Sequence, residues 1–241
     1  MNSVSVVIPA YRAERFVKRC FDSIAQQTVM PDEIVVVVDG CERTLGALEA
    51  AVTPRVKPNL ATLTRVIWLP ENLGAESIGR VYNIGMICAR GDTVMFFDVD
   101  DEMMPHYVES MLGIVNDGDF AVARQVVYQN GEVKNPNFVC SCIAGSRVSL
   151  MSAGGYEPWP CEEDSEFIHR LRQMGYTVRP PGEHNMVRNK EEGSITLSER
   201  TGIGTDLQQS YYRLRESRKK KPVVPDSIAI GKFVELYLFE D

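Results

Sequence analysis

The stretch TVMFFDVDDEM, residues 93–103, joins a short apolar run to a cluster of acidic residues. Residues 93–97 predict a buried β-strand, because the run is apolar almost without a break. Four carboxylates follow within five positions, at Asp98, Asp100, Asp101 and Glu102. Like charges this close repel one another by about 1 kcal/mol in water and by several times more near a protein surface. The cluster therefore needs a physical explanation.

Three further apolar runs, rich in β-branched residues, precede this stretch at residues 4–8, 33–38 and 65–69. Each is too apolar to alternate between a polar and an apolar face, which predicts strands buried on both sides. The segments 13–27 and 76–90 between them are long enough for helices. This alternation predicts an α/β protein with an open, mostly parallel, twisted sheet flanked by helices. Ligands of such sheets bind at the carboxyl ends of the strands.

The pattern is less regular after about residue 104, where Gly and Pro cluster. A helix is predicted over 163–175, with its apolar residues in one stripe and Gly175 as its C-cap. A tail is predicted from about residue 201, with a helix over 206–221 and a break at two prolines. A closing helix is predicted after them, with its apolar side formed by Phe233, Leu236 and Tyr237.

Composition places the chain among folded globular proteins. It has 241 residues, of which 44% are hydrophobic, and a formal net charge of −7. The acidic balance argues against a surface built mainly for nucleic acid. Six cysteines without a CxxC pair argue against a zinc site or a disulfide scaffold. The N-terminus lacks the pattern of a signal peptide and no run reaches membrane-spanning length, so we expect a cytoplasmic protein, with peripheral membrane contact left open.

The acidic cluster suits a divalent cation. If strand geometry continues past Phe97, Asp98 and Asp100 fall on one face, because side chains alternate along a strand. Mg²⁺ and Mn²⁺ prefer such hard oxygen ligands and complete their shell with water and phosphate. The alternative is a solvated acidic loop that opens a helix near Met103, since carboxylates stabilise a helix N-terminus. The residues alone leave both explanations open.

Two other strand ends carry groups that could contact a ligand. Pro9, Ala10 and Tyr11 follow the first strand, and Asp39 follows the second. A turn explains Asp39 by itself. It explains less well why three consecutive strand ends carry polar or aromatic groups at one edge of the sheet.

Taken together, these segments resemble the family 2 glycosyltransferases, nucleotide-sugar-dependent enzymes of the GT-A fold. The resemblance rests on SVVIPAY, EIVVVVDG, ENLG, NIGMICARGDTVMFFDVDD, GSRVSLMSAGGY and EEDSEFIHRLRQMGY, which together span about residues 3–200. It implies one GT-A catalytic domain over 1–200, with a nucleotide-sugar-binding half at 1–103 and an acceptor-binding half at 104–200. The helical tail would occupy 201–241.

The resemblance implies roles for the donor side of the site. Pro9, Ala10, Tyr11 and Asp39 would line the base and ribose pocket. Asp98-Val99-Asp100 would be the DxD motif, with Asp98 near the ribose and Asp100 on a Mn²⁺ or Mg²⁺ ion that bridges the diphosphate. Arg80 would reach the donor, although the chain between Asn72 and Asn83 is a few residues longer than the family pattern. The alternative is that Arg80 is an exposed helical arginine.

The resemblance also assigns the catalytic side. Asp164 would be the general base of an inverting, single-displacement transfer, with Glu163 beside it. The alternative is that both only stabilise the positive end of a helix. Glu191 stands where the family often has a histidine, so His184 is the remaining candidate for a histidine metal ligand. Trp159 would stack on an acceptor sugar or pack beneath its own loop.

The sequence therefore predicts a metal-dependent inverting glycosyltransferase that takes a nucleotide-sugar, UDP-linked above others. A glycan, a lipid-linked sugar, a protein or a modified nucleobase all stay open as the acceptor, and so does a homo-oligomer. The basic run at 215–221 could contact an anionic surface or be the solvated end of a helix. The alternatives are a sugar nucleotidyltransferase, which would carry a Gly-rich loop after the first strand, and a non-catalytic nucleotide- or polyanion-binding protein. No GxGxxG motif follows the first strand, which sets a dehydrogenase aside.

Overall fold

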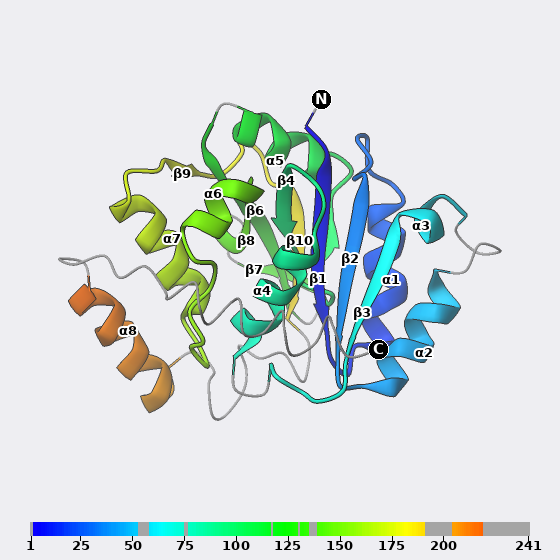
Figure 1. The fold of residues 1–241 in the computed structure, drawn as a ribbon, viewed down its shortest axis with the longest axis horizontal. Coiled ribbons are helices and arrows are strands. Elements are labelled where there is room, and N and C mark those ends of the chain that lie inside the picture. The colour runs from blue at the N-terminus through cyan, green and yellow to red at the C-terminus, as the bar shows by residue number, and fades with distance from the viewer. Residues whose placement is uncertain are drawn as a thin grey trace.

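The fold is a mixed sheet covered by helices on both faces (Figure 1). The computed structural model describes residues 2–52, 58–74, 77–116, 118–129, 131–134, 139–190 and 204–218. Within them the sheet has ten strands in the order β3-β2-β1-β4-β8-β6-β10-β5, with β7 and β9 paired to β6. The α/β architecture expected from the sequence is confirmed.

The first half of the chain supplies the parallel part of the sheet. Its strands are β1 (Val4–Ala10), β2 (Glu33–Asp39), β3 (Thr64–Leu69) and β4 (Thr93–Phe96). Its helices are α1 (Glu14–Ile24), α2 (Glu42–Ala51), α3 (Pro58–Leu63) and α4 (Ile78–Cys88). β1 pairs in parallel with both β2 and β4, so the carboxyl ends of these three strands are neighbours. All four strands predicted for this half are present.

Burial on both faces of β1 and β2 explains their unbroken apolar sequences. Val6 and Ile8 belong to one apolar core, which α1 covers, whereas Val7 belongs to a second core on the opposite face, which α4 covers. α4 lies so close to β1 that a Cβ atom on Gly85 would be 2.2 Å from Val7 Cγ1. A larger residue than glycine at position 85 would therefore push this helix off the sheet.

The second half completes the sheet with strands that run in both directions. Its elements are β5 (Glu102–Met103), α5 (Tyr107–Asn116), β6 (Phe120–Gln129), β7 (Glu132–Lys134), β8 (Val139–Ser146), α6 (Arg147–Ser152), α7 (Glu163–Gln173), β9 (Val178–Arg179) and β10 (Met186–Lys190). β8 is antiparallel to both β4 and β6 and lies between them, so strands of both halves share one sheet. The predicted helix is present as α7, but it ends at Gln173 and its C-cap is Met174 rather than Gly175. Gly175 follows the cap, and its φ of 91° is the left-handed conformation that glycine adopts most easily.

The tail contributes α8 (Asp206–Arg218), which begins where the sequence predicts a helix and is described up to Arg218. Residues 219–221 of the basic run and the closing helix expected around Phe233 lie outside the described residues. Within the described ranges, no helix is both long and apolar enough to cross a membrane.

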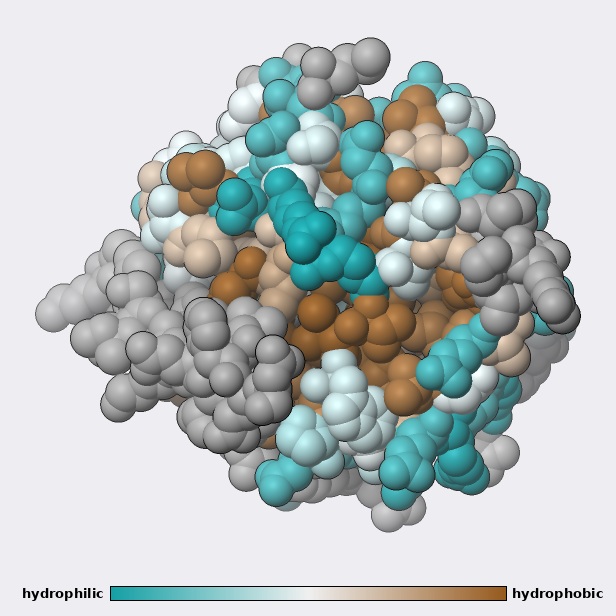
Figure 2. All heavy atoms as spheres, turned by 45° about the vertical axis from the view of Figure 1, so that its right-hand side comes forward, coloured by the Kyte–Doolittle hydropathy of each residue, from teal (hydrophilic) through white to brown (hydrophobic). Residues whose placement is uncertain are grey.

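β3 forms one edge of the sheet, since among the described strands it pairs with β2 alone. Val66 and Trp68 on this strand are 40% and 39% exposed. Figure 2 turns this side of the molecule forward, and hydrophobic residues gather at the centre of the view between polar ones. β3 therefore presents apolar side chains at the sheet edge.

Candidate functional site

The acidic residues after β4 lie in a turn. The Phe97 amide still donates to the Val7 carbonyl at 3.0 Å, after which the Asp101 amide donates to the Asp98 carbonyl at 3.2 Å and folds the chain back. The prediction that strand geometry continues past Phe97 is wrong, because β4 ends at Phe96. The expected convergence nevertheless occurs, since Asp98, Asp100 and Asp101 each place one carboxylate oxygen within 4.8 Å of the others. We call these three residues the acidic turn.

The helix that the alternative explanation expected near Met103 does not form there. Met103 lies in β5, and the next helix, α5, begins at Tyr107. The carboxylates of the acidic turn therefore do not serve as the first turn of a following helix, which leaves their repulsion without that compensation.

The carboxylates of the acidic turn are held in place by other elements. The Tyr82 hydroxyl, from α4, donates to Asp98 Oδ1. The Asn189 amide, from β10, donates to Asp101 Oδ1 at 3.1 Å. Burial and the neighbouring charge of Asp98 raise the pKa of Asp100 to about 6. The repulsion expected from the sequence is thus present, and a divalent cation among these oxygens would relieve it.

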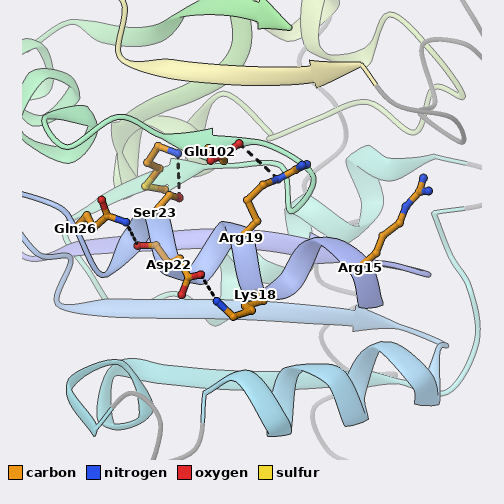
Figure 3. Close-up of a pocket in the computed structure, with 8 residues that line it drawn as sticks. Arg15, Lys18, Arg19, Asp22, Ser23, Gln26 and Glu102 are labelled. Atoms are coloured by element: carbon orange, nitrogen blue, oxygen red, sulfur yellow. Dashed lines mark hydrogen bonds and ion pairs between the residues drawn. The ribbon is translucent and has the colours of Figure 1, made fainter. Parts of the chain in front are cut away.

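One face of α1 holds the backbone of the acidic turn and of the residues just after it. Arg19 Nη2 donates to the Asp100 carbonyl at 2.7 Å, and its Nε lies 3.5 Å from Glu102 Oε1 (Figure 3). One turn further along α1, Ser23 Oγ accepts from the Met103 amide at 3.0 Å. Side chains of α1 therefore fix the backbone path of residues 100–103.

A pocket of about 370 Å³ lies on the outer side of α1, next to β5. Figure 3 draws the side chains that line it. Two of its three basic side chains are paired with acids that line the same pocket, Lys18 with Asp22 at 2.6 Å and Arg19 with Glu102. Most of its charges therefore neutralise one another, in contrast to those of the acidic turn. The candidate site is the acidic turn.

Asp39 closes a loop over the end of β2. It is 2% exposed, and its Oδ1 and Oδ2 accept from the amides of Leu73 and Gly74, both at 2.8 Å. Burial raises the pKa of this carboxyl, and the two amide bonds act against that rise. Gly40, at φ 65°, follows directly, and a Cβ there would be 2.7 Å from the Asn72 amide nitrogen. The ENLG segment is thus bound to the carboxyl end of β2.

The remaining donor-side residues lie at the same edge of the sheet. Pro9 and Ala10 are buried at the end of β1, and Tyr11, directly after them, is 39% exposed. Because β1 lies between β2 and β4, these residues stand between Asp39 and the acidic turn. Arg80 lies half-buried on α4. The structure thus brings the predicted donor-side residues of β1 and β2 to one edge.

Four aromatic rings pack beneath the acidic turn: Tyr82, Phe96, Tyr156 and Phe167. Tyr82 stacks on Tyr156 at 5.1 Å, and Phe96 meets both rings edge-on. The Phe167 ring, from α7, lies 4.8 Å from that of Tyr156. We call this group the aromatic cluster, and it joins α4, β4 and α7 around one site.

The loop that carries Tyr156 is locked by groups that sequence reasoning missed. Asn83, on α4, donates to the Tyr156 carbonyl and accepts from the Tyr156 amide, both at 2.8 Å. Gly155 has φ 64°, and a Cβ there would be 2.3 Å from Asn83 Oδ1. Arg170, paired with Glu166 at 2.8 Å, donates to the Gly155 carbonyl at 2.7 Å. The only sequence signal for this lock was the Gly-Gly-Tyr in the quoted segment GSRVSLMSAGGY.

Glu163 and Asp164 open α7, as both explanations of these residues expected. Burial and then the Asp164 charge raise the pKa of Glu163 well above its usual range, and Asp98 adds to the rise. Burial also raises the pKa of Tyr156, to which Asp164, Asp98 and Glu163 all contribute. The carboxyls of α7 and of the acidic turn therefore lie close enough to sense one another across the aromatic cluster.

Two predicted residues lie apart from this group. His184 is not among the clustered cation ligands of the described chain, and its carbonyl lies 3.0 Å from His106 Nε2. Trp159 is 5% exposed, and its ring lies 5.1 Å from that of Tyr211. This is the packed arrangement that was the alternative for Trp159, and it leaves little of the ring open to a sugar. A metal role for His184 and an acceptor role for Trp159 stay predictions.

Comparison with known proteins finds similarity to glycosyltransferases. The family model described as glycosyl transferase family 2 matches residues 5–171. The amylovoran biosynthesis glycosyltransferase AmsE of Erwinia amylovora is 27% identical over 243 residues, which cover 90% of this chain and 86% of that protein. The glycosyltransferase EpsH of Bacillus subtilis, described as putative, is 32% identical over 118 residues, which cover 48% of this chain but only 31% of that protein.

Solved structures share the fold at low sequence identity. S. aureus TarS 1-349 in complex with UDP-GlcNAc has a TM-score of 0.68 at 18% identity, covering 98% of this chain and 71% of that chain. The mannosyltransferase PcManGT of Pyrobaculum calidifontis, in complex with GDP-Man and Mn²⁺, has a TM-score of 0.64 at 17% identity, covering 92% and 62%. These similarities establish the fold.

Proposed function

The chain belongs to glycosyl transferase family 2, and from this we propose that it moves a sugar from a UDP-linked donor to an acceptor hydroxyl by a metal-dependent, inverting displacement. The observation that carries the proposal is the convergence of Asp98, Asp100 and Asp101 beside the carboxyl ends of β1 and β2. In an open α/β sheet, that edge is where a nucleotide binds. The nucleotide-sugars present in TarS and PcManGT support the donor class.

The acidic turn fits a divalent cation by its chemistry. It offers three carboxylate oxygens, the ligand type that Mg²⁺ and Mn²⁺ prefer. Asp100 and Asp98 would hold the ion, which would neutralise the negative charge that builds up on the departing diphosphate. Asp101 is 2% exposed, and the amide of Asn189 fixes its side chain beside them. Mn²⁺ in the PcManGT complex supports this assignment.

The donor would lie along the ends of β1 and β2. Tyr11 is exposed enough to pack against a nucleobase. Asp39 is buried and both of its oxygens bind the ENLG loop, so it would shape the base and ribose pocket by holding that loop at the end of β2. Arg80 would add a positive charge near the donor.

The acceptor hydroxyl would lose its proton to Asp164. The reaction joins the acceptor oxygen to the anomeric carbon as the bond from that carbon to the diphosphate breaks, and the proton passes to the base. Glu163 is buried and has a raised pKa, so it favours its neutral form. The glycan, lipid-linked sugar, protein or nucleobase that supplies the hydroxyl is a question for acceptor screening.

Donor binding is tested by thermal unfolding. UDP and Mn²⁺ together, at roughly 100 times the dissociation constant, should stabilise the fold by about 2.7 kcal/mol, which corresponds to roughly 5–10 °C in melting temperature. UDP in the presence of EDTA and Mn²⁺ alone should each shift the temperature less, because Asp98 and Asp100 would hold the ion and the ion would neutralise the charge of the diphosphate. GDP and TDP with Mn²⁺ test the preference for uridine. An unchanged melting temperature with every nucleotide and metal would contradict the proposal.

The support of the acidic turn by α1 leads to a second expectation. Arg19→Ala removes the bond to the Asp100 carbonyl and should weaken Mn²⁺ binding in the presence of UDP about tenfold, the lower end of the usual effect of removing a group that orients metal ligands. Lys18→Ala is the matched control, because the Lys18 side chain is 81% exposed on the same helix and, in the part of the chain that the structure describes, pairs with Asp22 of its own helix. Calorimetric titration measures both variants. Equal affinity of the Arg19 variant and the wild type would show that α1 does not orient the ligands.

A further inference from the structure

Glu162 has an unusual backbone conformation immediately before the two carboxyls of α7. Its φ of 63° and ψ of 9° are left-handed, a region that residues other than glycine seldom adopt. Such a conformation persists where surrounding contacts impose it, and it is often found at functional sites. Glu162 also accepts the Glu166 amide at 2.8 Å on its carbonyl, so its backbone begins the helix that carries Asp164.

Both side-chain oxygens of Glu162 are bound by α8, which lies far along the chain. Arg215 Nη1 lies 2.5 Å from Oε2, and Gln208 Nε2 donates to Oε1. The side chains of Arg215 and Glu162 are only 15% and 14% exposed, so water screens this ion pair less than a surface pair. Charge-assisted hydrogen bonds of this kind are the stronger ones in proteins.

The same face of α8 makes a second contact with the segment before α7. Gln208 and Arg215 are separated by two helical turns, and Tyr211 lies between them on that face. The Tyr211 ring packs against the Trp159 ring at 5.1 Å. The segment 159–162 is therefore held by an aromatic contact at one end and by two side-chain bonds at the other.

We propose that α8 positions the catalytic base: Arg215 and Gln208 hold Glu162 in its left-handed conformation, which sets the direction in which α7 begins and thereby places Asp164 against the acceptor hydroxyl. This inference rests on the proposed function, since it takes Asp164 as the base. Arg215 is a positioning residue, because it acts through Glu162 and touches no reacting group. The tail thus contributes to catalysis without lining the donor site.

The arrangement has a specific kinetic consequence. By the proposed function, donor and cation would bind at the ends of β1, β2 and β4, which are other elements than the 159–162 segment. A displaced base slows the transfer step, and a shift of about 1 Å in such a group costs up to roughly a hundredfold in rate. Loss of the α8 contacts should therefore lower kcat and leave donor affinity unchanged.

Arg215→Ala tests this directly. We expect the kcat of transfer to fall about tenfold, while the KM for the donor and the UDP–Mn²⁺ dissociation constant stay within twofold of wild type. Arg213→Ala is the matched control, because Arg213 is exposed on the same helix and, among the described residues, its side chain bonds Gln209 of that helix. It should behave as wild type. A kcat of Arg215→Ala within twofold of wild type, or a parallel loss of donor affinity, would overturn the inference.

Further variants separate positioning from folding. Arg215→Lys keeps a charge for Glu162 and should recover part of the kcat, which general destabilisation would not predict. Glu162→Gln and Arg215→Ala should be non-additive in kcat, since both break the same pair. Additive effects, or no recovery with lysine, would overturn the inference.

Asp164→Asn, assayed in parallel, distinguishes the two proposals. Full transfer activity in that variant would refute the base assignment and with it the proposed mechanism. Loss of activity in Asp164→Asn together with wild-type activity in Arg215→Ala would refute the role of α8 alone.

Discussion

Asp100→Asn is expected to lower the rate of sugar transfer by about 100-fold to 1000-fold, the usual cost of removing one group that stabilises charge in the transition state. The variant keeps the size of the side chain and removes one negative charge from the acidic turn. With one ligand fewer, the cation binds more weakly and the departing diphosphate is less well neutralised. The measurement is the initial rate of transfer at saturating donor and Mn²⁺.

The same substitution should not destabilise the protein in the absence of nucleotide and metal. Burial and repulsion by Asp98 raise the pKa of Asp100 to about 6, so ionisation of this carboxylate lowers the stability of the folded protein when no cation is present. Asparagine carries no charge, so the substitution removes this destabilisation. We therefore expect an unchanged or higher melting temperature without ligand, and loss of most of the stabilisation by UDP with Mn²⁺. A lower melting temperature without ligand, together with unchanged stabilisation by UDP and Mn²⁺, would show that Asp100 stabilises the fold and does not hold a cation.

Asp92→Asn is the matched control for this experiment. Asp92 is exposed, lies just before β4 at the end opposite to the acidic turn, and accepts from the amide and hydroxyl of Ser3. Its loss should leave transfer and UDP–Mn²⁺ binding as in wild type. A comparable loss of activity in this variant would mean that charge along β4, and not a cation site, explains the effect.

Asp164→Asn is expected to lower the transfer rate by about 100-fold to 10,000-fold, because an amide cannot take the proton of the acceptor hydroxyl. Donor affinity should stay unchanged, since Asp164 lies on α7 and the residues proposed to bind the donor lie at the ends of β1, β2 and β4. Transfer rate and UDP–Mn²⁺ affinity are measured on the same preparation. Unchanged transfer would contradict the assignment.

Asp206→Asn controls for the structural role of an acid in the first turn of a helix. Asp206 opens α8 as Asp164 opens α7, and it is exposed. Losing a favourable interaction with the helix dipole costs about 0.3–1 kcal/mol in either variant. Both variants should therefore have a slightly lower melting temperature, and only Asp164→Asn should lose transfer activity. Equal activity in the two would favour the purely structural explanation of Asp164.

The first half of the fold could be predicted because its strands are buried on both faces. Valine and isoleucine runs in β1 and β2 have no polar face to confuse the pattern, since α1 and α4 cover opposite sides. In the second half, the central strand β8 cannot be recognised from its sequence. β8 has the sequence VCSCIAGS, poor in strand-forming residues, and includes Gly145, where a Cβ would be 2.4 Å from the Phe120 ring. Its place between β4 and β6 depends on partners distant in the chain, which periodicity does not reveal.

The candidate site, too, could be predicted from the sequence only in part. Carboxylates at a strand end stand out in the sequence, because local spacing alone makes Asp98 and Asp100 conspicuous, whereas the role of Asp164 is implied by the resemblance to the family. Their supports do not, since the bond from Arg19 to the Asp100 carbonyl spans 81 positions and the bond from Arg215 to Glu162 spans 53. An arginine on a helix has the same sequence pattern whether it is solvated or fixes a turn. Only tertiary structure distinguishes the two cases.

The most direct test of the account is a crystal structure of the protein with UDP and Mn²⁺, with anomalous diffraction data recorded to locate the manganese. We predict an anomalous peak in contact with a carboxylate oxygen of Asp100 and with the diphosphate, and no such peak in crystals of Asp100→Asn grown and soaked in the same way. UDP bound at the ends of β1 and β2 without manganese beside Asp98 and Asp100, or manganese bound elsewhere, would contradict the central claim.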